Sequence, residues 1–180
     1  MSAINMKVPG DRTLPVQVEV TGDIAVLTFD RADKRNAISD ALAEGLRAFF
    51  ADPPKGVRAV VITGSGGHFS AGLDLGEQSR REPTDVLKHS RRWHELMEMI
   101  QFGGLPVVAA MTGSVIGGGL EIAASCHVRV AEPSVRFQLP EGKRGIFVGG
   151  GATVRIGRIL GPDRMTEMML TGRVYEAAEG

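Results

Sequence analysis

The stretch VIGGGLEIAASC (residues 115–126) places three glycines directly before a glutamate, and small or apolar residues follow. A glycine inside a helix costs roughly 1 kcal/mol relative to alanine, so this run indicates that some group must come close to the backbone. Glu121 is also costly to bury among apolar neighbours unless its charge is paired or its pKa is raised. Two such costs at adjacent positions predict a functional site.

The pattern around this stretch alternates strands with helices. Strand-like segments lie at 16–20, 24–30, 57–64, 105–115, 128–132 and 135–139, and helical periodicity occurs at 36–50, at 84–102 and in two stretches after Gly151. This alternation favours the α/β class, and a chain of 180 residues is long enough for one well-packed domain. We interpret residues 1–15 as an N-terminal extension and 16–180 as the core domain.

Charge and cysteine content limit the class of protein. Lys and Arg total 21, as do Asp and Glu, so the formal net charge is zero and no global field attracts nucleic acid or an anionic membrane. The single cysteine, Cys126, fits a reducing compartment. The N-terminus lacks an apolar signal core, and no run of about 18 apolar residues occurs. We therefore expect a cytoplasmic protein without nucleic-acid or membrane partners.

Several familiar motifs fail on inspection. GSGGHF at 64–69 begins like a dinucleotide-binding motif but has Phe69 in place of the last glycine. His94 and Glu95 begin a zinc-type HExxH motif, yet Glu98 stands where its second histidine belongs. No GxSxG or phosphate-binding GxxxxGK[ST] motif occurs. We therefore expect no metal site.

Two strand-to-glycine-turn junctions remain, ITGSGGHFSAGLD (62–74) and MTGSVIGGGLE (111–121). Each can present backbone N–H groups at a helix start, and donors from Ala71 and Gly118 aimed at one point would form an oxyanion hole. Tight turns and close helix packing explain the same glycines equally well. Glu141, in the turn FQLPEGKRG, could divide acid and base roles with Glu121, although by itself it is typical of a surface loop.

Four segments together resemble the enoyl-CoA hydratase/isomerase, or crotonase, superfamily. They are DRADKRNAIS (30–39), HFSAGLDL (68–75), GGGLEIAASCHVRVAE (117–132) and FQLPEGKRGIFVGGGATVRIGRILG (137–161). The resemblance runs in order from about residue 16 to the end of the chain. It implies a spiral of ββα units, trimers or pairs of trimers, and acyl-CoA thioester substrates, with coenzyme A as part of the substrate and no prosthetic group.

The resemblance also implies roles for individual residues. Ala71 and Gly118 match the backbone donors that hold the thioester oxygen, and Glu121 and Glu141 match the glutamates that hold a water molecule in hydratases. The expected reaction is addition of water across the α,β double bond of an enoyl-CoA. The residues that match the coenzyme A-binding loops are Lys34, Arg35, Ala37, Ala71, Gly72, Leu73, Asp74, Leu75 and Gly118.

Some features depart from the family pattern or leave alternatives open. Gly142, Lys143 and Arg144 follow the PE turn where many hydratases have apolar residues, and Val148 stands where proline is common. The shape of the acyl pocket is therefore not predicted. An enoyl-CoA or dienoyl-CoA isomerase, a non-catalytic binder of CoA thioesters and a nucleic-acid-binding scaffold are the alternatives to a hydratase.

The chain ends at LTGRVYEAAEG, where members of this superfamily typically continue through further helices. All four implied catalytic positions precede the end. We expect that a C-terminal helical part is missing, because EAAEG looks like a motif cut midway; the alternative is a protein that ends here and compensates by association. We also expect the helix at 166–170 to expose Met168, Met169 and Leu170, and the chain to form a homo-oligomer that covers this surface. Met97, Met99, Met165, Met168 and Met169 are assigned to core or subunit packing.

Overall fold

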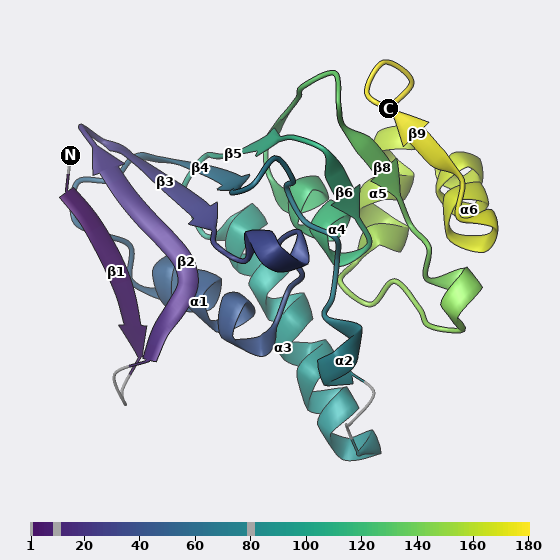
Figure 1. The fold of residues 1–180 in the computed structure, drawn as a ribbon, viewed down its shortest axis with the longest axis horizontal. Helices are drawn as coiled ribbons and strands as arrows, with labels where there is room; N and C mark the ends of the chain where they lie inside the picture. The colour runs from purple at the N-terminus through teal and green to yellow at the C-terminus, as the bar shows by residue number, and fades with distance from the viewer. Residues whose placement is uncertain (1, 9–11, 79–81) are drawn as a thin grey trace.

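The computed structural model describes residues 2–8, 12–78 and 82–180, and Figure 1 shows its fold. The larger sheet has six strands in the order β1-β2-β3-β4-β5-β7. These strands are β1 (Ser2–Val8), β2 (Arg12–Thr21), β3 (Ile24–Phe29), β4 (Ala59–Gly64), β5 (Val107–Met111) and β7 (Val128–Ala131). The first three pair antiparallel, and β3, β4, β5 and β7 pair in parallel. The predicted α/β class is confirmed.

The predicted hairpin at the start of the core forms β2 and β3. Gly22 turns the chain between them in the left-handed conformation, with φ +63°. Alternate residues of β3 are fully buried, as expected for a strand with one face in the core. Helix α1 (Asp40–Ala51) packs on β2, where a methyl group added at Gly45 would lie 3.0 Å from Val16 Cγ2.

Two long helices support the sheet, and both were predicted. Helix α3 (Pro83–Phe102) buries Trp93, Leu96, Met97 and Ile100 on one stripe, and it packs against α1 and α4. Helix α1 begins at Asp40, later than predicted, because Asn36 has φ +54° and Ile38 pairs with Leu73 instead of entering the helix.

The C-terminal half of the fold contains a second, smaller sheet (Figure 1). It has the order β6-β8-β9, with β6 and β8 parallel and β9 antiparallel to β8. Its strands are β6 (Ser114–Ile116), β8 (Arg136–Gln138) and β9 (Val174–Glu176). The helices of this half are α4 (Gly118–Ser125), α5 (Ala152–Leu160) and α6 (Pro162–Thr171). Helix α4 starts two residues after β6 and packs against α3 and α5, so it joins the two sheets.

Three features differ from the expectations. Residues 2–8 of the predicted extension form β1 in the large sheet, while residues 1 and 9–11 lie outside the described part. The sequence of residues 2–8 alternates apolar and other residues, the ordinary signal of a strand. Strand β9 was not predicted. Met168 is fully buried instead of exposed, whereas Leu170 has 61% of its surface exposed as expected.

Among the described residues, no helix has the length and apolar character needed to cross a bilayer.

Candidate active site

The two glycine-rich junctions meet, as the sequence predicts. Ser70 pairs with Val115, and the Ser70 N–H donates to the Ser114 carbonyl at 2.8 Å. The loop that follows Ser70 therefore lies against the start of α4. A methyl group added at Gly72 would lie 2.8 Å from the Ile116 carbonyl oxygen and 3.4 Å from the Gly118 nitrogen. Only glycine allows this close approach, because Gly72 also has φ +89°.

Ala71 was predicted as a donor, but its backbone N–H is already occupied in the structure. Its N–H already donates to the Arg35 carbonyl at 2.9 Å. Leu73 is better placed: the Ile38 N–H donates to the Gly72 carbonyl at 2.8 Å, so that carbonyl points toward Ile38. The Leu73 N–H belongs to the same trans peptide and points the opposite way. No described residue accepts a hydrogen bond from it.

The second predicted donor, Gly118, has a backbone N–H that is not engaged within the described part of the fold. It is the first residue of α4, and no described residue accepts a hydrogen bond from its N–H. A methyl group added at Gly118 would lie 3.3 Å from Leu73 Cγ and 3.1 Å from Trp93 Cζ2. Gly118 and Leu73 are therefore neighbours, and neither N–H has an acceptor among the described residues.

Glycine is found at each of the three positions of this run for a different reason. Gly117 has φ +52°, and a methyl group there would lie 2.7 Å from Glu141 Oε1. Gly118 supplies the free N–H. Gly119 packs on Ser70, where an added methyl group would lie 2.7 Å from Ser70 Cβ. Site formation and tight packing, the two interpretations that the sequence left open, therefore apply to different glycines of the same run.

Glu121 lies inside α4 and is only 2% exposed. Its Oε2 accepts a hydrogen bond from Trp93 Nε1 at 2.8 Å. Its Oε1 accepts from the Gly150 N–H at 2.7 Å and from the Ala152 N–H at 3.3 Å. Burial raises the pKa of the Glu121 carboxyl, and these donors act in the opposite direction. Sequence reasoning missed Trp93 and Gly150 because neither belongs to a catalytic motif.

Glu141 is buried beside Gly117 and is not a surface residue. It follows Pro140 and precedes the short helix η2 (Gly142–Arg144). Its Oε2 is buried without a hydrogen-bond partner among the described residues. Burial, together with the negative charge of Glu121, raises the pKa of Glu141 to about 7. A buried carboxyl oxygen without a partner is costly, so this atom marks a place for a ligand or a water molecule.

The other predicted binding residues lie on two loops that hold each other. Asp74 forms an ion pair with Arg31 at 3.0 Å, and this hydrogen-bonded partner lowers the Asp74 pKa. Lys34 Nζ lies 3.9 Å from Asp74 Oδ2, on the short helix η1 (Ala32–Lys34). Lys34 and Arg35 are exposed, Ala37 is half-buried, and Leu75 begins helix α2 (Leu75–Gln78) with 40% of its surface exposed.

Asn36 is a structural residue of the site that the sequence analysis did not single out. It is fully buried, and its side-chain amide donates to the Ser65 carbonyl at 2.9 Å and the His68 carbonyl at 2.7 Å. Its Oδ1 accepts from the Arg31 N–H at 3.0 Å. Asn36 thus ties the loop of Lys34 and Arg35 to the loop that follows β4.

Comparisons with known proteins point in one direction. The family model of enoyl-CoA hydratase/isomerase matches residues 19–180. A probable enoyl-CoA hydratase of Mycobacterium tuberculosis is 33% identical over 165 residues, 91% of this chain and 64% of the relative. The mevalonyl-coenzyme A hydratase of Beauveria bassiana is 36% identical over 87% of this chain and 59% of its own length. The chain thus spans about 64% of the first of these curated relatives.

Solved structures have the same fold. A crystal structure of a protein from Rhodopseudomonas palustris superimposes with a TM-score of 0.89 at 52% sequence identity, over 92% of this chain and 64% of that one. The enoyl-CoA hydratase of Thermoplasma volcanium gives a TM-score of 0.88 at 28% identity, over 93% of this chain and 68% of that one.

Proposed function

Because the chain belongs to the enoyl-CoA hydratase/isomerase family, we propose that it adds water across the α,β double bond of an enoyl-CoA thioester. One observation carries the proposal: within the described residues, the buried Glu141 has an unpartnered oxygen and lies against Gly117, next to Gly118, whose N–H has no acceptor and whose helix holds the buried Glu121. Hydration needs a base for water, an acid for Cα and donors for the thioester oxygen, and this arrangement can supply all three.

In this proposal the N–H groups of Leu73 and Gly118 hold the thioester oxygen. Attack of water at Cβ moves negative charge onto that oxygen as an enolate, and the two donors stabilise it. Each preorganised donor of this kind is worth about 100-fold or more in rate. Leu73 replaces Ala71 here because its N–H is the one that points away from the pairing with Ile38.

The environments of the glutamates suggest which is the base. In this proposal Glu121 takes the proton from water as oxygen bonds to Cβ, and its three N–H donors offset part of the effect by which burial raises its pKa. Glu141, with a pKa raised to about 7, is protonated in about half of the molecules at neutral pH, and this form gives its proton to Cα as the enolate collapses. Water is thereby added in full, and the water that enters next passes a proton from Glu121 back to Glu141.

Coenzyme A recognition is proposed for the two interlocked loops. The exposed cations Lys34 and Arg35 are proposed to meet its phosphates, and Ala37, Gly72, Asp74 and Leu75 are proposed to contact the rest of the coenzyme A chain. Assembly into trimers or pairs of trimers, and a cytoplasmic location, are part of the same proposal.

Crotonyl-CoA tests the reaction. Loss of the enoyl-thioester absorbance with formation of the 3-hydroxyacyl product supports hydration. Double-bond migration in a 3-enoyl-CoA without hydration would make the protein an isomerase. Glu121→Gln and Glu141→Gln should each lower kcat by about 100-fold or more while binding of the CoA ester changes little. Wild-type turnover in both variants would show that the glutamates are not catalytic.

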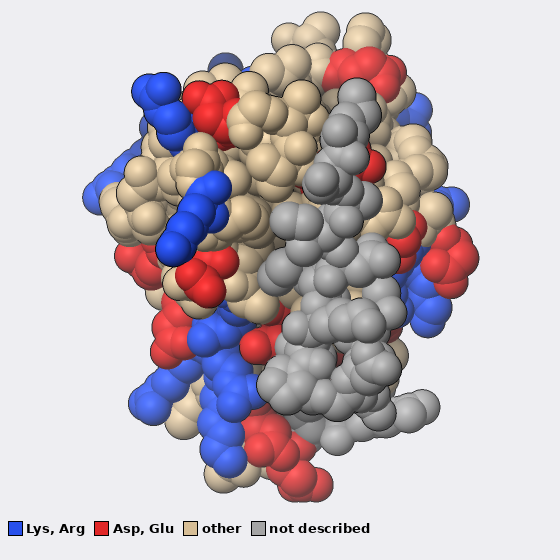
Figure 2. All heavy atoms as spheres, turned by 90° about the vertical axis from the view of Figure 1, so that its left-hand side faces the viewer, with Lys and Arg blue, Asp and Glu red and all other residues tan. Residues whose placement is uncertain are grey.

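The two non-catalytic alternatives, a nucleic-acid-binding scaffold and a binder of CoA thioesters, predict different observations. On the face in Figure 2, acidic side chains lie among the basic ones wherever the surface is described, so this face offers no continuous basic track for a phosphate backbone. Tight binding of CoA esters with no turnover of any acyl chain would instead identify a binder.

A further inference from the structure

The loop whose N–H groups bind Glu121 is itself fixed by a further hydrogen bond. The N–H groups of Gly150 and Ala152 both donate to Glu121 Oε1. The carbonyl of Gly150, which lies between these two N–H groups along the chain, accepts a hydrogen bond from Arg155 Nη1 at 2.9 Å. A methyl group added at Gly150 would lie 2.5 Å from Glu121 Oε2, so this backbone is pressed against the carboxylate.

Arg155 is placed by three bonds from one side chain. It lies on α5, is 8% exposed, and uses Nη1 for Gly150, Nε for Gln101 at 2.6 Å and Nη2 for Glu98 at 2.7 Å. The planar guanidinium can satisfy three acceptors in fixed directions at once, which a lysine cannot do. Gly151 has φ +94° and lies against the same Nη1, so a larger residue there would displace the guanidinium.

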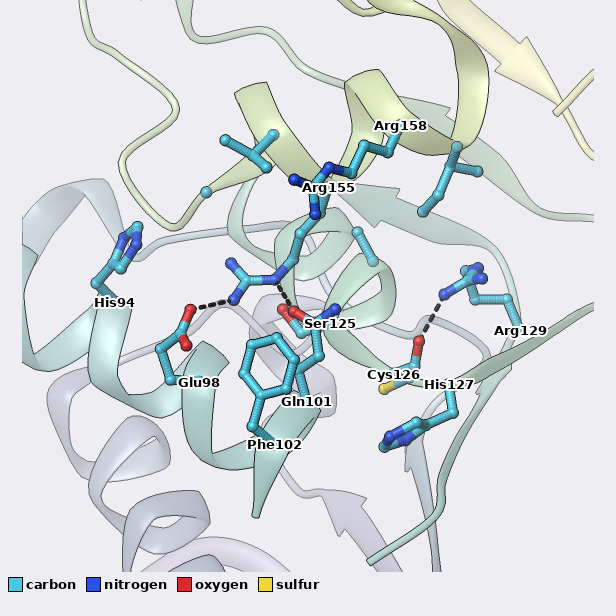
Figure 3. A pocket seen from close by; sticks show the side chains of 14 residues that line it. His94, Glu98, Gln101, Phe102, Ser125, Cys126, His127, Arg129, Arg155 and Arg158 are labelled. Carbon is cyan, nitrogen blue, oxygen red and sulfur yellow. Dashed lines mark hydrogen bonds and ion pairs between the residues drawn. The ribbon is translucent and has the colours of Figure 1, made fainter. Parts of the chain in front are cut away.

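Helix α3 anchors both oxygens of Glu121. Directly, its Trp93 donates to Oε2. Indirectly, its Glu98 and Gln101 fix Arg155, and Arg155 fixes the loop that donates to Oε1. Figure 3 shows Arg155 reaching from α5 toward Glu98 and Gln101. It forms part of the wall of a pocket of about 440 Å³, whose lining includes Gly151 of the same loop but not Glu121.

We propose that Arg155 is a positioning residue for Glu121: its guanidinium holds the Gly150 carbonyl and so keeps the N–H groups of Gly150 and Ala152 aimed at the carboxylate. This rests on the proposed function, in which Glu121 is the base. Arg155 touches no reacting atom. It acts on Glu121 indirectly, by fixing the backbone at Gly150.

The charge of Arg155 adds to this positioning. The charged groups that act on Glu121 are Arg155 from α5 and Glu141 from the segment before η2, while α3 contributes the neutral indole of Trp93. Arg155 lowers the pKa of Glu121 against the effect of burial. Loss of Arg155 should therefore raise the Glu121 pKa for two reasons: its positive charge is lost, and the N–H donors are released.

The test compares Arg155→Met and Arg155→Lys with Arg158→Met. Arg158 is the matched control, because it lies one turn further along α5, lines the same pocket and is exposed. Since a misplacement of 1 Å can cost about 100-fold in rate, we expect kcat to fall about 10- to 100-fold in Arg155→Met with KM nearly unchanged. Arg155→Lys should lie between this variant and the wild type, and Arg158→Met should match the wild type.

A second readout does not depend on turnover. Trp93 is the only tryptophan, and its N–H binds Glu121, so its fluorescence should follow the protonation of that carboxyl. Glu121→Gln should abolish this pH transition and so identifies it. The midpoint should lie at higher pH in Arg155→Met than in the wild type, and it should not move in Arg158→Met.

These readouts separate two kinds of failure. If no enoyl-CoA is hydrated by the wild type, the proposed function fails, and the fluorescence midpoint still decides whether Arg155 controls Glu121. Equal midpoints in the wild type and Arg155→Met would overturn the inference, as would equal losses of kcat in Arg155→Met and Arg158→Met. If Arg155→Met does not fold, wild-type kcat in Arg155→Lys is the result that overturns it.

Discussion

Replacing Glu141 with glutamine should make the protein more stable and much less active at pH 8. Burial raises the pKa of this carboxyl from 4.5 to about 7. Between these values the folded state binds more protons than the unfolded state, so the stability falls as the pH rises. The difference between the two pKa values corresponds to about 3 kcal/mol of lost stability above pH 7. Below pH 4.5 both states are protonated and the loss disappears.

Glutamine does not ionise, so it removes this loss but leaves a buried amide whose hydrogen bonds are incomplete. The incomplete bonds cost about 1–2 kcal/mol, and we expect a net gain of about 1–2 kcal/mol at pH 8. For a chain of this size each kcal/mol raises the melting temperature by about 2–4 °C. The activity should fall about 100-fold or more, because the acid that protonates Cα is gone.

The assay is thermal unfolding of the wild type and Glu141→Gln at pH 8 and at pH 4. Glu19→Gln, at an exposed position on β2, serves as the control and should melt like the wild type at both values. A Glu141→Gln variant that is less stable than the wild type at pH 8 would refute the reasoning. So would a gain of equal size at pH 4, because protonation could not then be its cause.

Three further changes probe the rest of the site. An amide-to-ester replacement at Leu73, which deletes only its N–H, should lower kcat by about 100-fold, and steady-state kinetics with wild-type kcat would exclude this donor. Trp93→Phe removes a donor that lowers the Glu121 pKa, so the acid limb of the kcat/KM profile should move to higher pH; an unchanged limb contradicts this. Gly119→Ala places a methyl group 2.7 Å from Ser70 Cβ, so urea unfolding should show a loss of about 1–3 kcal/mol, whereas full stability would mean that the contact relaxes freely.

Local pattern was enough to predict most of the elements. The hairpin of β2 and β3, the buried stripe of α3 and the break between α5 and α6 at Gly161 and Pro162 all follow from periodicity and turn residues. Strand β1 also carries an alternating pattern, but its position at the start of the chain led to its interpretation as an extension. Element type is a property of neighbouring residues, so the sequence alone is informative about it.

The sequence also pointed to the chemical groups of the candidate site. Glu121 stands out because glycines and apolar residues surround it, and Gly118 because it opens a helix after a strand. Glu141 was recognised through its family resemblance, since a glutamate after a proline is by itself typical of a surface turn. In the structure its carboxyl lies against Gly117, a contact between residues far apart in the sequence.

Only the tertiary structure decided which backbone groups are free and which are occupied. The sequence pointed to Ala71 as a donor and not to Leu73, but in the fold the Ala71 N–H is bound to the Arg35 carbonyl, while the Leu73 N–H has no acceptor among the described residues. In the same way, the three bonds of Arg155 depend on α3 and α5 meeting across the fold. A residue's type fixes what it can donate or accept, while the direction of each hydrogen bond depends on packing between segments that are distant in the chain.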